Sequence, residues 1–342
     1  MDSLTHVVLG AVIGEVAGGK KVGRSAMVVG AGAQCLPDID IVAATWLDPA
    51  VNLMAHRGIT HSFLFVIAIG FALMLLAHKM RPGPGLLFWF SFFSIQLFTH
   101  VFIDSFNAYG VGFFEPFHDY KYSFHTLYVA DPFFTIWPAL AVIALLFAKR
   151  PSARKAWAIS GIALCICYLG YAMYNRSVVV DKVVASVGDS TPMLVTPTPL
   201  NSWLWFVAVE SAEHVESFRI AHVSVFDESQ AISFRTVPIQ RELVTESPYT
   251  ETINALNKFS QRFYVVEQWS DTVVYNDLRF GQMKGWENPD NRFVFHYFVN
   301  YPDDNMLVMQ RGRFAGWDVE TVKRMGQRIF SGDPNRVDEN KR

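Results

Sequence analysis

Cysteine and the common catalytic signatures are scarce in this chain. Its 342 residues include three cysteines, Cys35, Cys165 and Cys167, and all lie in apolar segments, so burial explains them and no disulfide is expected. There is no Gly-x-Ser-x-Gly elbow and no glycine-rich loop before a Lys-Ser/Thr pair, which leaves a serine hydrolase or a phosphate-cradling loop without support. A net charge of −2 and the lack of a basic stripe with interleaved aromatics argue against a nucleic-acid partner.

The amino terminus lacks the basic region and cleavage site of a signal peptide, so its first apolar run is expected to be retained. Hydrophobic residues form 51% of the chain and gather in its first half. Two short windows, Leu4–Ala17 and Ser25–Leu36, fit tilted spans, re-entrant half-helices or interfacial helices. Four longer windows approach the roughly 20 residues that cross a hydrocarbon core and are predicted to span a membrane: Thr60–His78, Leu86–Ile103, Pro132–Lys149 and Ala156–Tyr174.

After Tyr174 the pattern changes to short segments rich in Val, Phe, Tyr and Trp, which is typical of strands. The predicted strands are Ser177–Val184, Trp203–Val209, Arg219–Phe226, Phe263–Glu267, Thr272–Tyr275 and Phe293–Val299, and the predicted helices are Thr250–Gln261 and Val319–Phe330. We therefore expect an α-helical integral membrane domain with about six hydrophobic segments at residues 1–175. A soluble β-rich α+β domain at 176–332 and a polar tail at 333–342 would follow.

Basic residues are divided unequally between the connections. If the six windows alternate across a bilayer, one set of connections holds nine, namely Lys20, Lys21, Arg24, Lys79, Arg81, Lys149, Arg150, Arg154 and Lys155. The opposite set holds only Arg57 and Lys121. By the positive-inside rule the first set is cytoplasmic, and six crossings would leave the β-rich domain on the other side.

Eight ionisable residues lie beside or inside the apolar windows, all at the non-cytoplasmic ends: His6, Asp38, Asp40, His56, His61, His100, Asp104 and Asp131. Unpaired charge at bilayer depth costs several kcal/mol, so such a cluster indicates a functional site. Mixed imidazole and carboxylate donors favour a divalent metal, Zn²⁺ first and Mn²⁺ second, over Ca²⁺. Because eight candidate ligands are more than one tetrahedral ion can bind, two or more ions are expected.

The spacing of these residues supports ligation, although each motif has a simpler alternative. His100 and Asp104 are one helical turn apart and share a face, but a histidine bonded to its own aspartate would look the same. His56 and His61 are roughly 140° out of alignment on a helix, so they converge only if the segment is partly non-helical. Its alternative is an interfacial loop with Arg57 at lipid headgroups.

Further candidates have weaker support. Asp38 and Asp40 follow a proline and can bridge adjacent metals from an extended segment, with a solvated turn as the alternative. The interpretation of His6 as a ligand depends on the other candidate ligands. His118 and His125 stay open as binders of metal or phosphate, whereas the remaining histidines are not expected to bind metal: His78, His214, His222 and His296.

Together, these motifs resemble the YdjM-type (YbcI-like) family of bacterial membrane-bound metal-dependent hydrolases. The resemblance is carried over residues 1–135 by DSLTH, LPDID, HRGITHS, His100-x-x-x-Asp104-x-x-Asn107-x-x-Gly110 and Asp131-Pro132. TPTPLNSWLW at 196–205 and DLRFG at 277–281 resemble the longer members. The family implies hydrolysis at the bacterial inner (cytoplasmic) membrane. Its pattern is distantly similar to zinc-dependent phospholipase C and single-strand nucleases, whose full set of histidines is missing here.

We therefore expect metal-assisted hydrolysis of a phosphoester in a lipid or lipid-linked substrate. The metal would activate a water, one of Asp38, Asp40 or Asp131 would take its proton, and Arg57 would neutralise the phosphate. An amide or ester substrate stays open, and no protein partner is predicted. The alternatives are a proton or metal-ion transporter and a non-enzymatic metal-binding membrane protein.

Overall fold

The computed structural model describes residues 1–211, 216–227, 232–301, 304–305, 314 and 316–332, so the predicted tail at 333–342 lies outside the described residues. The chain forms two compact units. The first, which is helical, contains Met1–Trp46, Met54–Tyr171 and Pro199–Asn201. The second contains Leu47–Leu53, Ala172–Thr198 and the chain from Ser202 onward.

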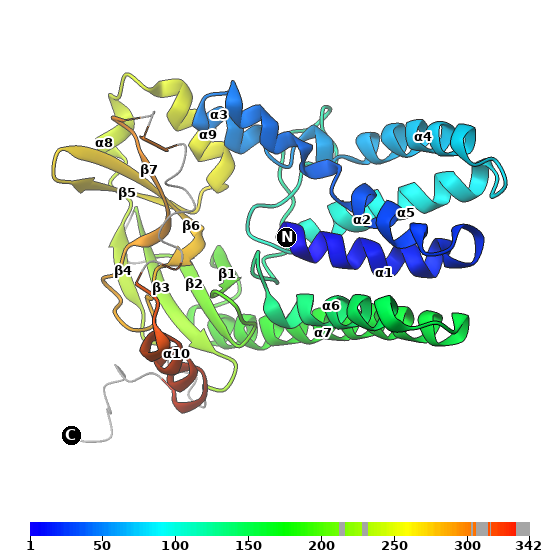
Figure 1. Cartoon of the computed structure of the whole chain (residues 1–342). Coiled ribbons are helices and arrows are strands. Elements are labelled where there is room, and N and C mark those ends of the chain that lie inside the picture. Colours follow the sequence, from blue (N-terminus) through cyan, green and yellow to red (C-terminus); the bar gives the residue numbers. More distant parts are fainter. Residues whose placement is uncertain (212–215, 228–231, 302–303, 306–313, 315, 333–342) are drawn as a thin grey trace. The chain divides into compact units, whose positions relative to one another are not determined.

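The helical unit is built from helices whose starts are fixed by polar caps. Asp2, Ser62 and Asp131 accept backbone N–H groups at the starts of α1, α4 and α6, respectively, which satisfies donors that a helix leaves free. In chain order, the helices up to residue 187 are α1 (Ser3–Val22), α2 (Ser25–Gln34), the 3-10 helix η1 (Pro37–Thr45), α3 (Pro49–Ala55), η2 (Ile59–His61), α4 (Phe63–Met80), α5 (Leu86–Asp104), α6 (Pro132–Phe147) and α7 (Pro151–Val187) (Figure 1). Most of α3 and the end of α7 belong to the second unit.

Among the described residues, three helices are long and apolar enough to cross a membrane: α4, α5 and α7. A fourth span exists if α2 and η1, bent by 47°, count as one. The window predicted at Pro132–Lys149 forms α6, whose 16 residues are short of the roughly 20 that a bilayer core requires. The structure thus gives three or four candidate spans, where the sequence predicted four clear spans among six segments.

Close helix packing brings the ends of these helices together. An added Cβ at Gly14 would clash with the carbonyl oxygen of Ala26, and one at Gly30 would clash with that of Gly10, so α1 and α2 approach backbone to backbone. Both α2 and α4 pack on α5, and α6 packs on α1. As a result, the segments that follow α2, precede α4 and end α5 are neighbours.

The second unit contains two antiparallel sheets (Figure 1). The first has the order β1 (Met193–Pro197), β2 (Leu204–Glu210), β3 (Ser217–Ser224) and β4 (Arg235–Pro238), and the second has β5 (Tyr264–Trp269), β6 (Thr272–Gln282) and β7 (Phe293–Phe298). Its helices are α8 (Glu242–Thr245), α9 (Thr250–Ser260) and α10 (Val319–Ser331). In the register, Val207 of β2 lies between Val195 and Ala221, and all three are buried.

One predicted strand is wrong. Ser177–Val184 is not extended but belongs to α7, which continues to Val187. Val179 and Val183 are one turn apart in this helix and pack against the first sheet, so their face is helical although the residue types favour strands. Four of the other predicted strands and both predicted helices are confirmed within a few residues. The strand predicted at Thr272–Tyr275 is present but continues to Gln282, and β1 and β4 were not predicted.

Candidate metal centre

Four side chains from three elements point their donor atoms at one another. They are Asp38 of η1, His61 of η2, and His100 and Asp104 of α5, and their ligand atoms all lie within 4.8 Å of one another. The Nε2 atoms of His61 and His100 are 3.1 Å apart. Asp104 Oδ2 is 3.4 and 3.7 Å from these two nitrogens, and Asp38 Oδ1 is 3.8 and 3.5 Å from them. We call these four residues the metal cluster.

Breaks in the helices produce this convergence. Pro37 begins η1, which turns Asp38 toward α5. Between His56 and His61 the backbone of Arg57 takes a positive φ of 56°, and its N–H donates to Asp40 Oδ2 at 2.6 Å. The predicted non-helical segment before α4 is therefore present.

Hydrogen bonds fix the protonation of both histidines. His100 Nδ1 donates to the carbonyl of Gln34, while His61 Nδ1 faces Thr60 Oγ1 at 3.0 Å and Asp40 Oδ2 at 3.5 Å. Burial lowers the pKa of His61 to about 3, so its ring is neutral at pH 7. With Nδ1 of each ring next to an oxygen partner, the two Nε2 atoms face each other, an arrangement that a cation between them would stabilise.

One oxygen of the buried Asp104 carboxylate accepts no hydrogen bond, although it is paired with the Arg57 guanidinium. Its Oδ1 accepts from His6 Nε2 at 3.1 Å and from the amino group of Met1. Its Oδ2 lies 3.0 Å from Arg57 Nε but is not aligned for a hydrogen bond, and both atoms lack a hydrogen-bond partner. A buried acceptor left unsatisfied costs about 1–3 kcal/mol, more when it is charged. Coordination of a metal by Oδ2 would remove this penalty.

The spacing of the metal cluster fits a tetrahedral ion. Bonds of 2.0–2.1 Å around Zn²⁺ place neighbouring ligand atoms about 3.3–3.4 Å apart. Five of the six distances between the donor atoms run from 3.1 to 3.8 Å, and the sixth, between the Asp38 and Asp104 oxygens, is within 4.8 Å. Two imidazoles and two carboxylates are also a donor set that Zn²⁺ accepts, whereas Ca²⁺ takes 6–8 oxygens.

Three of the predicted ligands adjoin the metal cluster without being among its four donors. The ring of His6 stacks on that of His100 with centroids 3.7 Å apart. Asp40 accepts from Thr60 Oγ1 at 3.2 Å and pairs with His56 Nδ1 at 3.3 Å, so it positions the His61 ring from outside.

Asp131 is not brought into the metal cluster. Its carboxylate caps α6 by accepting from the backbone of Phe133 and Phe134, and it accepts from Tyr168 Oη at 2.9 Å. Burial raises the pKa of Asp131 to about 6. These partners account for the residue without a metal.

Arg57, which was predicted to neutralise a substrate phosphate, already has partners within the protein. Arg57 is 4% exposed; besides Asp104, it contacts Asn107 Oδ1 at 2.7 Å and the Met1 carbonyl at 3.4 Å. It offsets the charge of Asp104, and its role toward a phosphate stays a prediction.

Sequence reasoning missed the supporting groups on α2 and at the amino terminus. Gln34 Oε1 contacts His6 Nδ1 at 3.3 Å, and its backbone carbonyl fixes His100. Gln96 Nε2 donates to the carbonyl of Gly10 at 3.1 Å. The available signal was a glutamine inside each of two apolar windows, since buried amides need partners.

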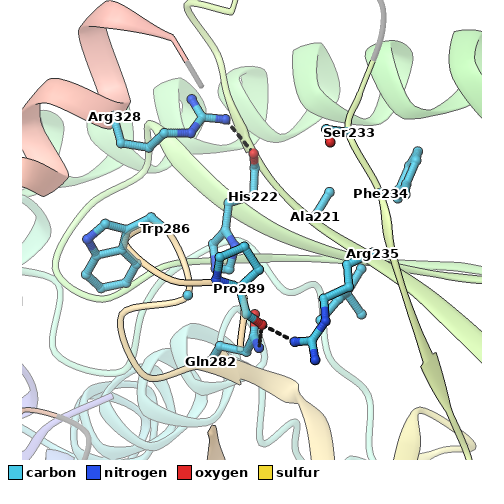
Figure 2. A pocket seen from close by; sticks show the side chains of 11 residues that line it. Ala221, His222, Ser233, Phe234, Arg235, Gln282, Trp286, Pro289 and Arg328 are labelled. Carbon is cyan, nitrogen blue, oxygen red and sulfur yellow. Dashed lines mark hydrogen bonds between the residues drawn. The ribbon is translucent and has the colours of Figure 1, made fainter. Parts of the chain in front are cut away.

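The remaining histidines lie elsewhere. His118 Nδ1 accepts from the backbone of Tyr120, and His296 belongs to β7, whereas His214 is outside the described residues. His222 lines a small cavity of about 90 Å³ within the β-rich unit (Figure 2). Arg328 donates to its carbonyl at 2.5 Å, and burial lowers the pKa of its ring to about 3. His222 is not part of a group of three or more His, Cys, Asp or Glu side chains that could hold a metal, as far as the described residues show.

These features define a membrane protein whose helical region holds a buried His/Asp cluster of the kind that binds metal ions. The chain belongs to the family described as YdjM inner membrane protein, which matches residues 1–179 and confirms the family indicated by the motifs. YfhP, an uncharacterized protein of Bacillus subtilis (strain 168), is 26% identical over 334 residues, covering 93% of this chain and 95% of that protein. No solved structure matches.

Proposed function

We propose that this protein is a metal-dependent hydrolase of the inner membrane that cleaves a phosphoester of a lipid or lipid-linked substrate. One observation carries the proposal. The side chains of His61, His100 and Asp104 are wholly buried, whereas Asp38 is 26% exposed. Three fixed donors and one accessible side are what catalytic zinc sites require, because water and substrate must reach the ion.

The surroundings of Asp38 support a lipid substrate. On η1, Ile39 is 58% and Ile41 is 68% exposed, and η1 continues α2 as part of a candidate bent span. Exposed apolar side chains beside a polar site mark a surface that meets lipid or another apolar partner. An amphiphile could then reach Asp38 without leaving the membrane.

In this proposal the three buried donors bind the ion, and Asp38 acts as the general base on the solvent-accessible side of the site. A bound Zn²⁺ would bring the pKa of a coordinated water toward 7 and offset charge on the phosphoryl oxygens. Asp38 would accept the proton from the attacking water. Asp40 and Thr60 would keep the His61 lone pair directed inward, since their oxygens face its Nδ1.

The metal is proposed to be Zn²⁺, with Mn²⁺ as the second choice. The prediction of two or more ions stays a prediction, and Asp40 with His56 would supply the next donors.

We also propose that the metal cluster and the β-rich unit lie on the non-cytoplasmic side. The support is the count of nine basic residues in one set of connections against two in the other, which applies if α1, α2 and α6 cross the bilayer together with α4, α5 and α7. Cysteine accessibility at Ser190 and Arg81 in intact cells tests this proposal. Labelling of Ser190→Cys from outside is expected, and a cytoplasmic Ser190 would overturn it.

Hydrolysis is tested with purified protein in detergent and a panel of phospholipids and bis-p-nitrophenyl phosphate, with and without chelator. Asp38→Asn should keep the metal and the fold while turnover falls by about 100-fold, within the usual range for a general base. Asp131→Asn makes the same chemical change outside the metal cluster and should keep its turnover. If the wild type hydrolyses the substrates equally fast with and without chelator, this mechanism is eliminated.

A structural metal site is the second candidate, because four protein donors around one ion are typical of sites without catalysis. In that case Asp38→Asn would lower thermal stability together with metal affinity, and no panel substrate would be hydrolysed. Transport has less support, since the described donors form one group rather than a series at several depths.

A further inference from the structure

An apolar groove lies on the surface of the helical unit between α2, α4 and α5. It is lined chiefly by Val29, Gly32, Leu36, Leu73, Leu76 and Phe93. On α2 the lining residues Ser25, Val29 and Gly32 recur every three or four positions, and Leu36, just before η1, continues the same spacing, so one face of this segment forms a wall. The eleven steps from Ser25 to Leu36 correspond to about 16 Å.

The two ends of the groove differ. Leu36 at one end is two residues from Asp38, the exposed member of the metal cluster. At the other end Arg81 and Ser25 both donate to the carbonyl of Val22. Between these ends the lining side chains are apolar. A molecule lying in the groove would therefore be apolar along its length and reach the metal cluster at one end.

We propose that the groove holds an acyl chain of the substrate and thereby places the lipid headgroup at Asp38. This inference rests on the proposed function and names its substrate as an acylated lipid. Because α4 and α5 are candidate spans, the groove faces the hydrocarbon of the bilayer.

The dimensions of the groove favour an acyl chain over a helix from a second protein. Its volume of about 390 Å³, spread over about 16 Å, gives a mean cross-section of about 24 Å². A helix about 10 Å in diameter needs about 80 Å². An extended acyl chain is thinner and fits without separating α2 from α4.

A large side chain at Gly32 can fill the groove without disturbing the backbone. A Cβ added at Gly32 meets no atom within 4 Å, and its φ is not positive, so Gly32→Phe occupies the groove without backbone strain. Gly170 on α7 has the same properties and does not line the groove. Gly170→Phe is thus a matched control for the change in size and helix propensity.

The first readout is binding and requires no hydrolysis. The full chain is placed in phosphatidylcholine vesicles with a trace of phosphatidylglycerol carrying a diazirine on its acyl chain, and photolabelled peptides are identified by mass spectrometry. Labelling of α2 and α4 at the groove should fall at least about tenfold in Gly32→Phe, since each buried methylene is worth roughly fourfold in affinity. Labelling in Gly170→Phe should match the wild type. Groove labelling that Gly32→Phe leaves unchanged overturns the proposal.

The second readout compares a long-chain phospholipid with soluble bis-p-nitrophenyl phosphate. Gly32→Phe should raise KM for the phospholipid by about tenfold and leave kcat and the soluble diester unchanged. If the wild type hydrolyses neither substrate, the proposed function fails while photolabelling still decides the groove. If the wild type hydrolyses both substrates and Gly32→Phe has the same KM for the phospholipid, the groove proposal fails and the proposed function stands. Leu76→Trp, on the opposite wall, repeats the test if Gly32→Phe does not accumulate.

Discussion

Replacing Asp104 with asparagine tests the charge balance of the metal cluster with little change of shape. The Asp104 carboxylate lies 3.0 Å from the Arg57 guanidinium, and both side chains are buried. The other side-chain contacts of Arg57 in the described structure, with Asn107, the Met1 carbonyl and the Tyr109 ring, are neutral. Removing one partner of a buried ion pair costs about 3–5 kcal/mol, so Asp104→Asn should be destabilised by about that much.

Metal loss makes the same variant insensitive to chelator. An ion present at about 1,000 times its Kd stabilises the folded state by about 4 kcal/mol. We therefore expect chelator to lower the unfolding temperature of the wild type but not that of Asp104→Asn, which lacks one donor. Thermal unfolding followed by tryptophan fluorescence in one detergent, together with elemental analysis, measures both effects.

Asp131→Asn is the control, because asparagine caps a helix about as well as aspartate and Asp131 lies outside the metal cluster. It should keep the metal and lose no stability at pH 7. An Asp104→Asn protein that retains one ion per chain and unfolds at the wild-type temperature would refute the reasoning about charge and ligation.

Three further outcomes are expected. Burial raises the pKa of Asp131 to about 6, above its unfolded value of about 3.9, so its neutral form favours the fold. The free energy of unfolding of the wild type, relative to that of Asp131→Asn, should therefore fall by about 3 kcal/mol as pH rises from about 4 to 6. If this difference, measured with chelator present, does not change with pH, the expectation is contradicted. Asp40→Asn should weaken metal affinity about 10–100-fold by loosening the His61 ring, as measured by chelator competition. Gly14→Leu should prevent α1 and α2 from packing and sharply reduce folded yield, whereas Gly170→Leu should not.

The sequence predicted which side chains converge wherever local geometry was sufficient. His100 and Asp104 share a face of one helix, so their convergence follows from spacing alone. Asp38 and His61 depended on breaks that Pro37 and the segment after His56 signalled. Asp131 differs because its distance from the cluster is a tertiary property. Its local context, aspartate before Pro132 at a helix start, already favoured a cap.

The missed features of the fold have similar causes. The valine-rich run at 177–184 favours strands by residue type, but it continues an apolar helix and packs as a helix against the first sheet. The short strands β1 and β4 gain their partners only from the sheet as a whole. Propensity describes the isolated segment, whereas tertiary packing decides these cases.

The charges around the metal cluster bear on how many ions it holds. Asp104 pairs with the Arg57 guanidinium and the amino group of Met1, while Asp38 and Asp40 lie beside His100 and His61; three carboxylates and these two cationic groups leave the site negative by one or two charges. A single divalent ion brings it within one charge of neutrality, whereas two ions would leave it positive by two or three in a buried setting where unbalanced charge is costly. We therefore expect one ion per chain without substrate, and a second only when a phosphate adds negative charge. Elemental analysis showing two ions per chain in substrate-free protein would contradict this expectation.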